Sequence, residues 1–312
     1  MTEIAVNFYL FLKMLQPPFL KNGNTVAIIS TARKISLEEI KPTINLLKSW
    51  KLNVVIGKTI GASEHQFAGS EELRISDFQT MLDNPDINAI WCARGGYGSV
   101  KIIDEINFNL FLNNPKWIIG FSDITVLHSQ IYQLGVQTTH ATMPINILKN
   151  TKNSLNSLKS TLFGLNNNQK LPFSKFNKKG IATGILVGGN LSILYSLLGS
   201  KSAINTDGKV LFIEDFDEYI YHIDKMIVAL KRGGVFKNLK GLVVVGMTQL
   251  HDNEVSFGKT IEELILDNLS DYDFPICFDF KAGHIDDNNA FILGNEVMLT
   301  VTEKQVTIKT LN

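Results

Sequence analysis

The feature that most constrains the fold of this chain is the alternation of short apolar strand patterns with helical patterns along its first half. The expected strands cover residues 24–30, 53–57, 87–92 and 116–120, and the expected helices cover 36–50, 71–82, 99–106 and 123–134. Strand–helix–strand repeats of this kind join parallel strands through crossover helices. Residues 1–150 are therefore predicted to form a doubly wound parallel-sheet α/β domain.

The sequence changes character after residue 150. The stretch 151–180 is rich in Asn, Lys and Ser, which favours an exposed linker. Residues 181–312 are predicted to form a smaller, strand-rich α/β domain, since 312 residues exceed what one hydrophobic core usually organises. Its expected strands are 181–187, 209–214, 242–247, 276–280, 290–293 and 297–301, and its expected helices are 220–232 and 260–269.

Charge and cysteine content exclude several classes of partner. Lys plus Arg and Asp plus Glu each number 30, so no basic surface is expected for nucleic acid or an anionic membrane. The two cysteines, Cys92 and Cys277, lie in apolar runs and predict buried thiols in a reducing compartment rather than a disulfide or zinc site. We expect neither a metal nor a cofactor.

The first residues do not have the pattern of a secretory signal. Glu3 precedes the apolar run, no Lys or Arg comes before it, and no small-residue cleavage site follows. No stretch approaches the roughly 18 apolar residues that a membrane span needs. A cytoplasmic protein is expected, with Met14 as an alternative start.

Ser122 is the first candidate for chemistry. It follows the expected strand 116–120 and precedes a helix opened by Asp123. A serine on a tight strand-to-helix turn exposes its hydroxyl beside backbone N–H groups at the positive end of the helix. Ser122 could instead serve only as a helix cap, and the usual G-x-S-x-G pattern is absent.

A glycine-rich loop, 94–99, also lies between a strand and a helix. Three glycines among the four residues 95–98 allow the backbone to approach a ligand closely. The loop could cradle a phosphate, although its spacing matches neither G-x-G-x-x-G nor the P-loop. It could also provide an oxyanion hole, or it could be a purely structural turn.

An acid and a histidine complete the set of candidates. Glu214 ends an apolar strand, where α/β proteins place functional groups, while Asp217 and Glu218 could be simple solvated charges. Among six histidines, His140 and His284 lie beside strand ends and are the better catalytic candidates. No matching set of ligands supports a metal site in the acidic loop.

These motifs occur together in an order that resembles the LD-carboxypeptidase family of serine peptidases, from about residue 17 to the C-terminus. The motifs are 94–98, 120–125, 188–192, 212–215 and 283–284, together with 67–69, Arg74 and 114–116. The resemblance implies that Ser122 is the nucleophile, that Glu214 and His284 complete a triad, and that the amides of Gly96 and Asp123 form the oxyanion hole. The residues that it suggests for substrate binding are Arg94, Gly95, Tyr97, Gly189 and Asn190, although Arg94 could instead form a structural salt bridge.

The resemblance implies a peptide substrate and a homodimer. The expected reaction is release of D-alanine from a murein tetrapeptide, and the family's microcin C branch, which cleaves an aminoacyl-nucleotide carboxamide, is the alternative. Phe121 stands where the family often has Tyr. A nucleotide-binding module using 95–98 is a competing hypothesis. A glutaminase-like amidotransferase would need a cysteine where Ser122 stands.

Overall fold

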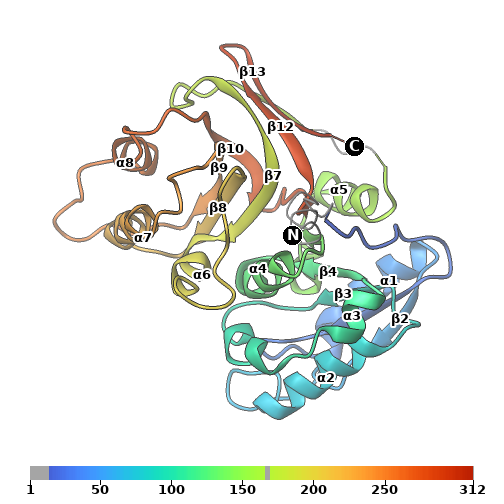
Figure 1. The fold of residues 1–312 in the computed structure, drawn as a ribbon. Coiled ribbons are helices and arrows are strands. Elements are labelled where there is room, and N and C mark those ends of the chain that lie inside the picture. The colour runs from blue at the N-terminus through green and yellow to red at the C-terminus, as the bar shows by residue number, and fades with distance from the viewer. Residues whose placement is uncertain (1–13, 166–168, 312) are drawn as a thin grey trace, which may run out of the picture.

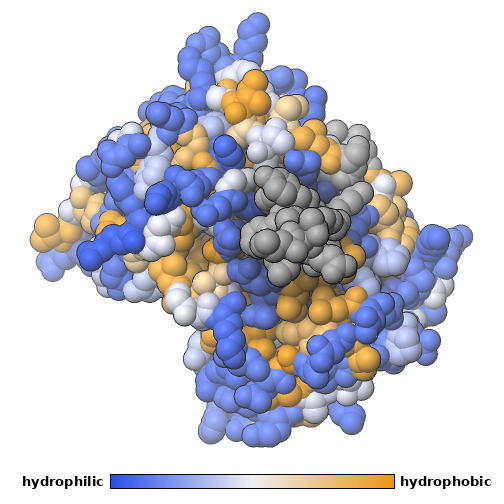
Figure 2. All heavy atoms as spheres, viewed as in Figure 1, coloured by the Kyte–Doolittle hydropathy of each residue, from blue (hydrophilic) through white to orange (hydrophobic). Residues whose placement is uncertain are grey.

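A computed structural model describes residues 14–165 and 169–311, and these residues form two β-sheets with helices packed against them (Figure 1). The strand order is β11-β5-β4-β3-β1-β2 in the first sheet and β10-β9-β8-β7-β12-β13-β6 in the second. Hydrophilic side chains cover much of the face seen in Figure 2, with hydrophobic groups interspersed in both halves.

The first sheet has parallel neighbours from β2 through to β5. Its strands are β1 (Thr25–Ile29), β2 (Asn53–Ile56), β3 (Ala89–Cys92), β4 (Trp117–Gly120), β5 (Thr138–His140) and β11 (Phe291–Leu293), and its helices include α1 (Leu37–Ser49), α2 (Glu71–Asp83), α3 (Asn109–Asn113) and α4 (Thr125–Gln133).

Side-chain alternation along these strands explains why both faces of the sheet are covered. Ala27 and Ile29 pack in a core with residues of α2, α3 and α4. Val26 and Ile28 point to the opposite face and pack with residues of α1. A parallel sheet buried on both sides is what nearly continuous apolar strands require, because successive side chains point to opposite faces. The prediction of a doubly wound N-terminal sheet is confirmed.

The second sheet combines a parallel half with an antiparallel half. β7 (Gly180–Asn190), β8 (Val210–Phe216), β9 (Gly241–Thr248) and β10 (Ile276–Gly283) run parallel, and β12 (Glu296–Val301), β13 (Gln305–Thr310) and β6 (Gln169–Pro172) continue it in antiparallel pairs. The helices α6 (Leu191–Ser196), α7 (Ile220–Arg232) and α8 (Ile261–Asn268) cover one side of β8 and β9 (Figure 1). The expected strand-rich α/β architecture is confirmed.

Three local expectations were wrong. The stretch 151–180 is more than an exposed connection, since α5 (Lys152–Leu162) buries Leu158 and Leu162 in the core of the first sheet. The strand expected at 290–293 is β11, which pairs with β5 of the first sheet instead of extending the second. Two 3₁₀ turns, η2 (Ser99–Lys101) and η3 (Ile103–Glu105), replace the helix expected at 99–106. Boundaries at residues 150 and 180 stay a prediction.

Candidate active site

Ser122 lies on a sharp turn at the carboxyl end of β4. The strand is fully buried, and Ser122 itself has a φ of 61° before the 3₁₀ turn η4 (Ser122–Ile124) leads into α4. Positive φ is uncommon for a residue with a side chain and occurs where surrounding structure enforces it, often at active sites. The turn has the backbone strain typical of a nucleophile elbow, although the sequence lacks the usual glycine pattern.

Glu214 and His284 meet at the carboxyl ends of two strands of the second sheet. His284 follows β10 directly, and its Nδ1 lies 2.6 Å from Oε2 of Glu214 on β8. The Glu214 side chain is 0% exposed and that of His284 is 20% exposed. Gly283, with a φ of 87°, makes this contact possible, because a Cβ there would lie 2.9 Å from Cβ of Glu214.

The carboxylate sets the protonation of the imidazole. Burial opposes the charged form of His284, but attraction to Glu214, the hydrogen bond between them and Asp215 together raise the pKa of His284 above its ordinary value. An ionised carboxylate only accepts hydrogen bonds, so the proton lies on Nδ1 and this N–H donates a hydrogen bond to Glu214. Nε2 of the neutral ring is then the nitrogen able to take a proton.

Ser122 and His284 line one cavity of about 390 Å³ that is built from both sheets. Loops of the first sheet contribute Ser122 and its neighbour Phe121, and loops of the second contribute His284. The other residues that line the cavity are Arg33, Arg94, Gly95, Gly96, Met143, Ile145, Asn146, Asn190, Ser192, Ile193, Asp215, Phe216, Asp217 and Glu218. The structure thus brings the predicted nucleophile and the predicted base to the same space.

The glycine loop lies directly against the serine turn. A Cβ on Gly95 would lie 3.4 Å from both the Asp123 amide nitrogen and Cβ of Ser122. The Asp123 side chain is 0% exposed, and its Oδ2 accepts a 2.9 Å hydrogen bond from the Ser99 amide. This bond ties the loop that carries Gly96 to the turn that carries Ser122.

The predicted substrate-binding residues divide into two groups. Gly95, Arg94 and Asn190 line the cavity, and the Arg94 guanidinium donates to the Lys34 carbonyl at 3.1 Å. Tyr97 and Gly189 do not line it: Tyr97 packs against Phe67 with ring centroids 6.1 Å apart, and Gly189 packs against Thr125.

Several cavity residues were not found from the sequence. Arg33 follows β1 and could have been found by the same strand-end criterion that selected Glu214. Asp215 accepts from Asn190 Nδ2 at 3.0 Å and from the Ser192 hydroxyl at 2.8 Å. Burial and the adjacent Glu214 carboxylate raise the pKa of Asp215 to about 6. Asp215 lies near the end of β8 and inside the motif 212–215, but nothing local in the sequence indicated a role for it.

His140 does not lie in the cavity. It is 0% exposed within β5, and neither ring nitrogen has a hydrogen-bond partner among the residues that the structure describes. Its ring lies edge-on to Phe212 and Phe121, with centroids 4.7 and 5.9 Å away. Burial lowers the pKa of His140 well below its ordinary value, so the imidazole is neutral. Of the two histidines singled out in the sequence, only His284 reaches the site.

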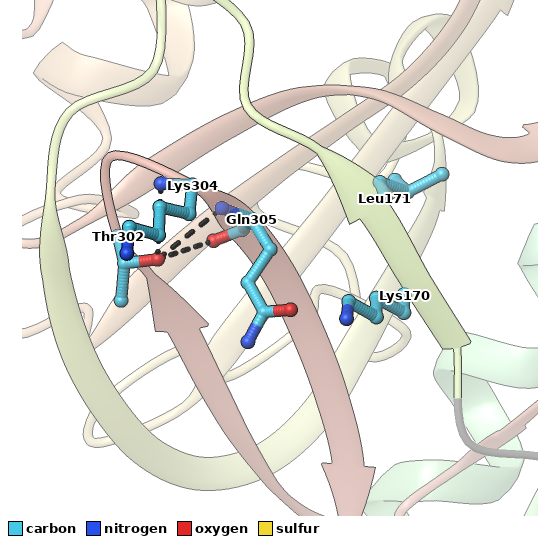
Figure 3. Close-up of a pocket in the computed structure, with 5 residues that line it drawn as sticks. All are labelled: Lys170, Leu171, Thr302, Lys304 and Gln305. Atoms are coloured by element: carbon cyan, nitrogen blue, oxygen red, sulfur yellow. Dashed lines mark hydrogen bonds between the residues drawn. The ribbon is translucent and has the colours of Figure 1, made fainter.

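A second pocket shares no lining residue with the cavity that contains Ser122 and His284. It is formed by side chains of β6 and of the β12–β13 turn, and the Thr302 hydroxyl donates to the Gln305 carbonyl at 3.0 Å (Figure 3). It contains no acid–base pair. Within residues 14–165 and 169–311, no cluster of three His, Cys, Asp or Glu could hold a metal ion, and no helix is long and apolar enough to cross a membrane.

The fold and the site define the class of the chain as a two-domain α/β serine hydrolase. Comparison with known families makes the assignment specific. Residues 26–141 match the LD-carboxypeptidase N-terminal domain, and residues 183–299 match the LD-carboxypeptidase C-terminal domain. The chain belongs to the LD-carboxypeptidase family and is a serine carboxypeptidase, as its sequence motifs indicate.

Individual relatives agree with this assignment. The chain is 31% identical over 301 residues to a probable murein peptide carboxypeptidase of Bacillus subtilis, with 94% of each chain covered. It is 25% identical to the microcin C7 self-immunity protein MccF of Escherichia coli, covering 85% of this chain and 86% of that protein. The crystal structure of muramoyltetrapeptide carboxypeptidase from Oxalobacter formigenes has a TM-score of 0.84 at 22% identity, covering 93% of this chain and 99% of that one, and shows the same fold.

Proposed function

We propose that this protein releases the C-terminal D-alanine of a murein tetrapeptide by cleaving the bond between an L-configured centre and the D-residue. The observation that carries the proposal is the shared cavity, in which the strained Ser122 turn meets His284, itself hydrogen-bonded to a fully buried Glu214 at 2.6 Å. The murein specificity is supported by the name of the Bacillus subtilis relative.

The proposed triad accounts for each proton. A serine hydroxyl is a weak nucleophile at neutral pH, so Nε2 of His284 takes the Ser122 proton as Oγ attacks the scissile carbonyl. Glu214 accepts the Nδ1 hydrogen, holds the productive tautomer and stabilises the imidazolium. The imidazolium then gives its proton to the departing amine of D-alanine, and water hydrolyses the acyl-enzyme by the same route.

The amides of Gly96 and Asp123 are proposed as the oxyanion hole. Their segments are joined by the hydrogen bond from the Ser99 amide to the Asp123 carboxylate. Two donors fixed before the reaction stabilise the developing charge at little reorganisation cost, each by about 3 kcal/mol.

Two guanidinium groups, Arg33 and Arg94, line the cavity and are proposed to bind the carboxylate of the departing D-residue. A planar guanidinium matches a carboxylate with two parallel hydrogen bonds. Arg33 was absent from the residues suggested by the sequence. We further propose a cytoplasmic homodimer that acts in cell-wall recycling.

Mass spectrometry of a murein tetrapeptide incubated with the protein tests the proposal. We expect loss of one alanine residue and a decrease in kcat of about 10⁶-fold in Ser122→Ala, which lacks the nucleophile. Ser76→Ala, on the exposed side of α2, is the matched control and should retain full activity. Near-normal D-alanine release by Ser122→Ala would contradict the assignment.

A microcin-type activity is the second candidate, supported by the resemblance to the Escherichia coli self-immunity protein. An aminoacyl-nucleotide carboxamide offered beside the tetrapeptide separates the two. Turnover of the nucleotide with an unchanged tetrapeptide would replace the murein assignment while leaving the triad in place.

A further inference from the structure

The imidazole of His284 contacts two phenylalanine rings. Phe216 stacks on it with centroids 4.8 Å apart and an angle of 21° between the planes. Phe121 approaches from another direction, with centroids 4.8 Å apart and an angle of 61°. Neither contact is a hydrogen bond, and neither residue has been given a role in the proposed triad.

The placement of both rings follows from local structure. Glu214 and Phe216 lie two residues apart on β8, and side chains at that spacing point to the same side of a strand. The strand that supplies the acid therefore also supplies the stacking ring. Phe121 directly precedes Ser122, so the turn that carries the nucleophile supplies the second ring.

A single hydrogen bond does not fix an imidazole. The bond from Nδ1 to Glu214 holds one edge of the ring, and the ring can still pivot about that bond and carry Nε2 away from Ser122. The stacked ring of Phe216 and the inclined ring of Phe121 both contact the imidazole and oppose this movement. The face of an aromatic ring also attracts a cation, which favours the imidazolium over the neutral imidazole.

We propose that the rings of Phe216 and Phe121, which both contact His284, form an aromatic clamp on the imidazole. Phe216 is then a positioning residue for the reaction. The proposal rests on the proposed triad. The clamp keeps Nε2 aimed at Ser122 during proton transfer and stabilises the imidazolium that forms. The proton path is unchanged: from Ser122 Oγ to Nε2, and from Nε2 to the leaving amine.

Other charged and titratable groups act on the same imidazole and must be separated from the clamp. Glu214 and Asp215 of β8 raise its pKa, and the Phe121 ring contacts both His284 and the buried His140 of β5. The side chains of Arg33, Arg94, Asp217 and Glu218 line the same cavity. Replacing Phe216 with an uncharged residue leaves all of these charged groups in the protein. A change in the titration of His284 is therefore assigned to the loss of the Phe216 ring.

The test compares Phe216→Leu, which keeps an apolar side chain without a ring, with Phe216→Tyr, which keeps the ring. Phe176→Leu, which removes a ring paired with Phe278 at 6.4 Å, is the matched control. For Phe216→Leu we expect kcat on the tetrapeptide to fall about tenfold with KM within about twofold, and the acid limb of the pH profile to shift down by about half a unit. Phe216→Tyr and Phe176→Leu should stay within about threefold of the wild type.

A second test uses the unaltered protein and does not depend on whether Phe216→Leu folds. Proton NMR should show the His284 ring protons shifted upfield by the stacked ring. The pH titration of the same signals reports the protonation of His284 in the absence of substrate. Absence of that shift, an unchanged acid limb in Phe216→Leu, or an equal loss in Phe216→Tyr would overturn the clamp. If wild-type protein released no D-alanine but kept the upfield shift, the proposed function would fail and the clamp geometry would stand.

Discussion

Replacement of Glu214 by Gln is the sharpest test of how the site works. The side chain is 0% exposed and lies 2.6 Å from His284 Nδ1. Gln keeps the size and shape of Glu, so the strand and the packing of Gly283 should survive. The substitution removes the negative charge, and it replaces one acceptor oxygen with an N–H donor.

The size of the effect follows from two contributions. Unit charges about 4 Å apart interact by about 4 kcal/mol at an effective dielectric of 20, and the imidazolium loses that stabilisation. This corresponds to a decrease in rate of about 10³-fold. The Gln amide can also turn an N–H toward Nδ1 and favour the wrong tautomer, which brings the expected decrease in kcat to about 10⁴-fold.

The assay is steady-state release of D-alanine, with thermal unfolding measured beside it. Asp215→Asn is the matched control, because Asp215 is also buried but bonds to Asn190 and Ser192 instead of His284. It should lose no more than about tenfold. A Glu214→Gln protein that unfolds normally and keeps more than a tenth of wild-type kcat would refute the reasoning.

Two further predictions concern pH and stability. The pKa of His284 is raised and only the neutral ring is a base, so kcat/KM should rise with pH through a limb above about 6.5. A limb below that value would contradict the role of Glu214. The same raised pKa stabilises the fold at acid pH, and this stabilisation is lost as pH rises through the folded-state pKa. Asp77 is 2% exposed and accepts from the Lys58 amide at 3.0 Å and the Thr59 hydroxyl at 2.6 Å, so Asp77→Ala should lower the free energy of unfolding in urea by about 3 kcal/mol, against less than about 0.5 kcal/mol for the exposed Asp86→Ala. An equal change in both variants would contradict the second prediction.

Much of the fold could be predicted because local sequence patterns specify its strands and helices. Apolar runs and helical periodicity identify β1 to β4 and the helices α1 and α2 between them, and their alternation requires a parallel sheet. The pairing of β11 with β5 could not be predicted in this way. Phe291 and His140 are neighbours across the sheet but distant in sequence, and no local preference records such a pair.

The candidate site was predicted unevenly for the same reason. Ser122, Glu214 and His284 follow apolar strands, where functional groups of α/β proteins occur, and the family resemblance gave them roles. Strand ends also selected His140, which is buried, and neither of its ring nitrogens bonds to any described residue. Whether a residue beside a strand end faces a cavity or a core depends on what packs over it.

The sequence by itself determined strands β1 to β4 and helices α1, α2 and α4, because each depends on residues close together in the chain, and its motifs indicated the family and the chemical groups. The tertiary structure alone decided which groups meet. His284 and Glu214 lie 70 residues apart and are joined by a 2.6 Å contact, and the cavity they share with Ser122 exists only where loops of both sheets converge. Such contacts arise from the packing of many distant side chains at once, which local propensity does not describe.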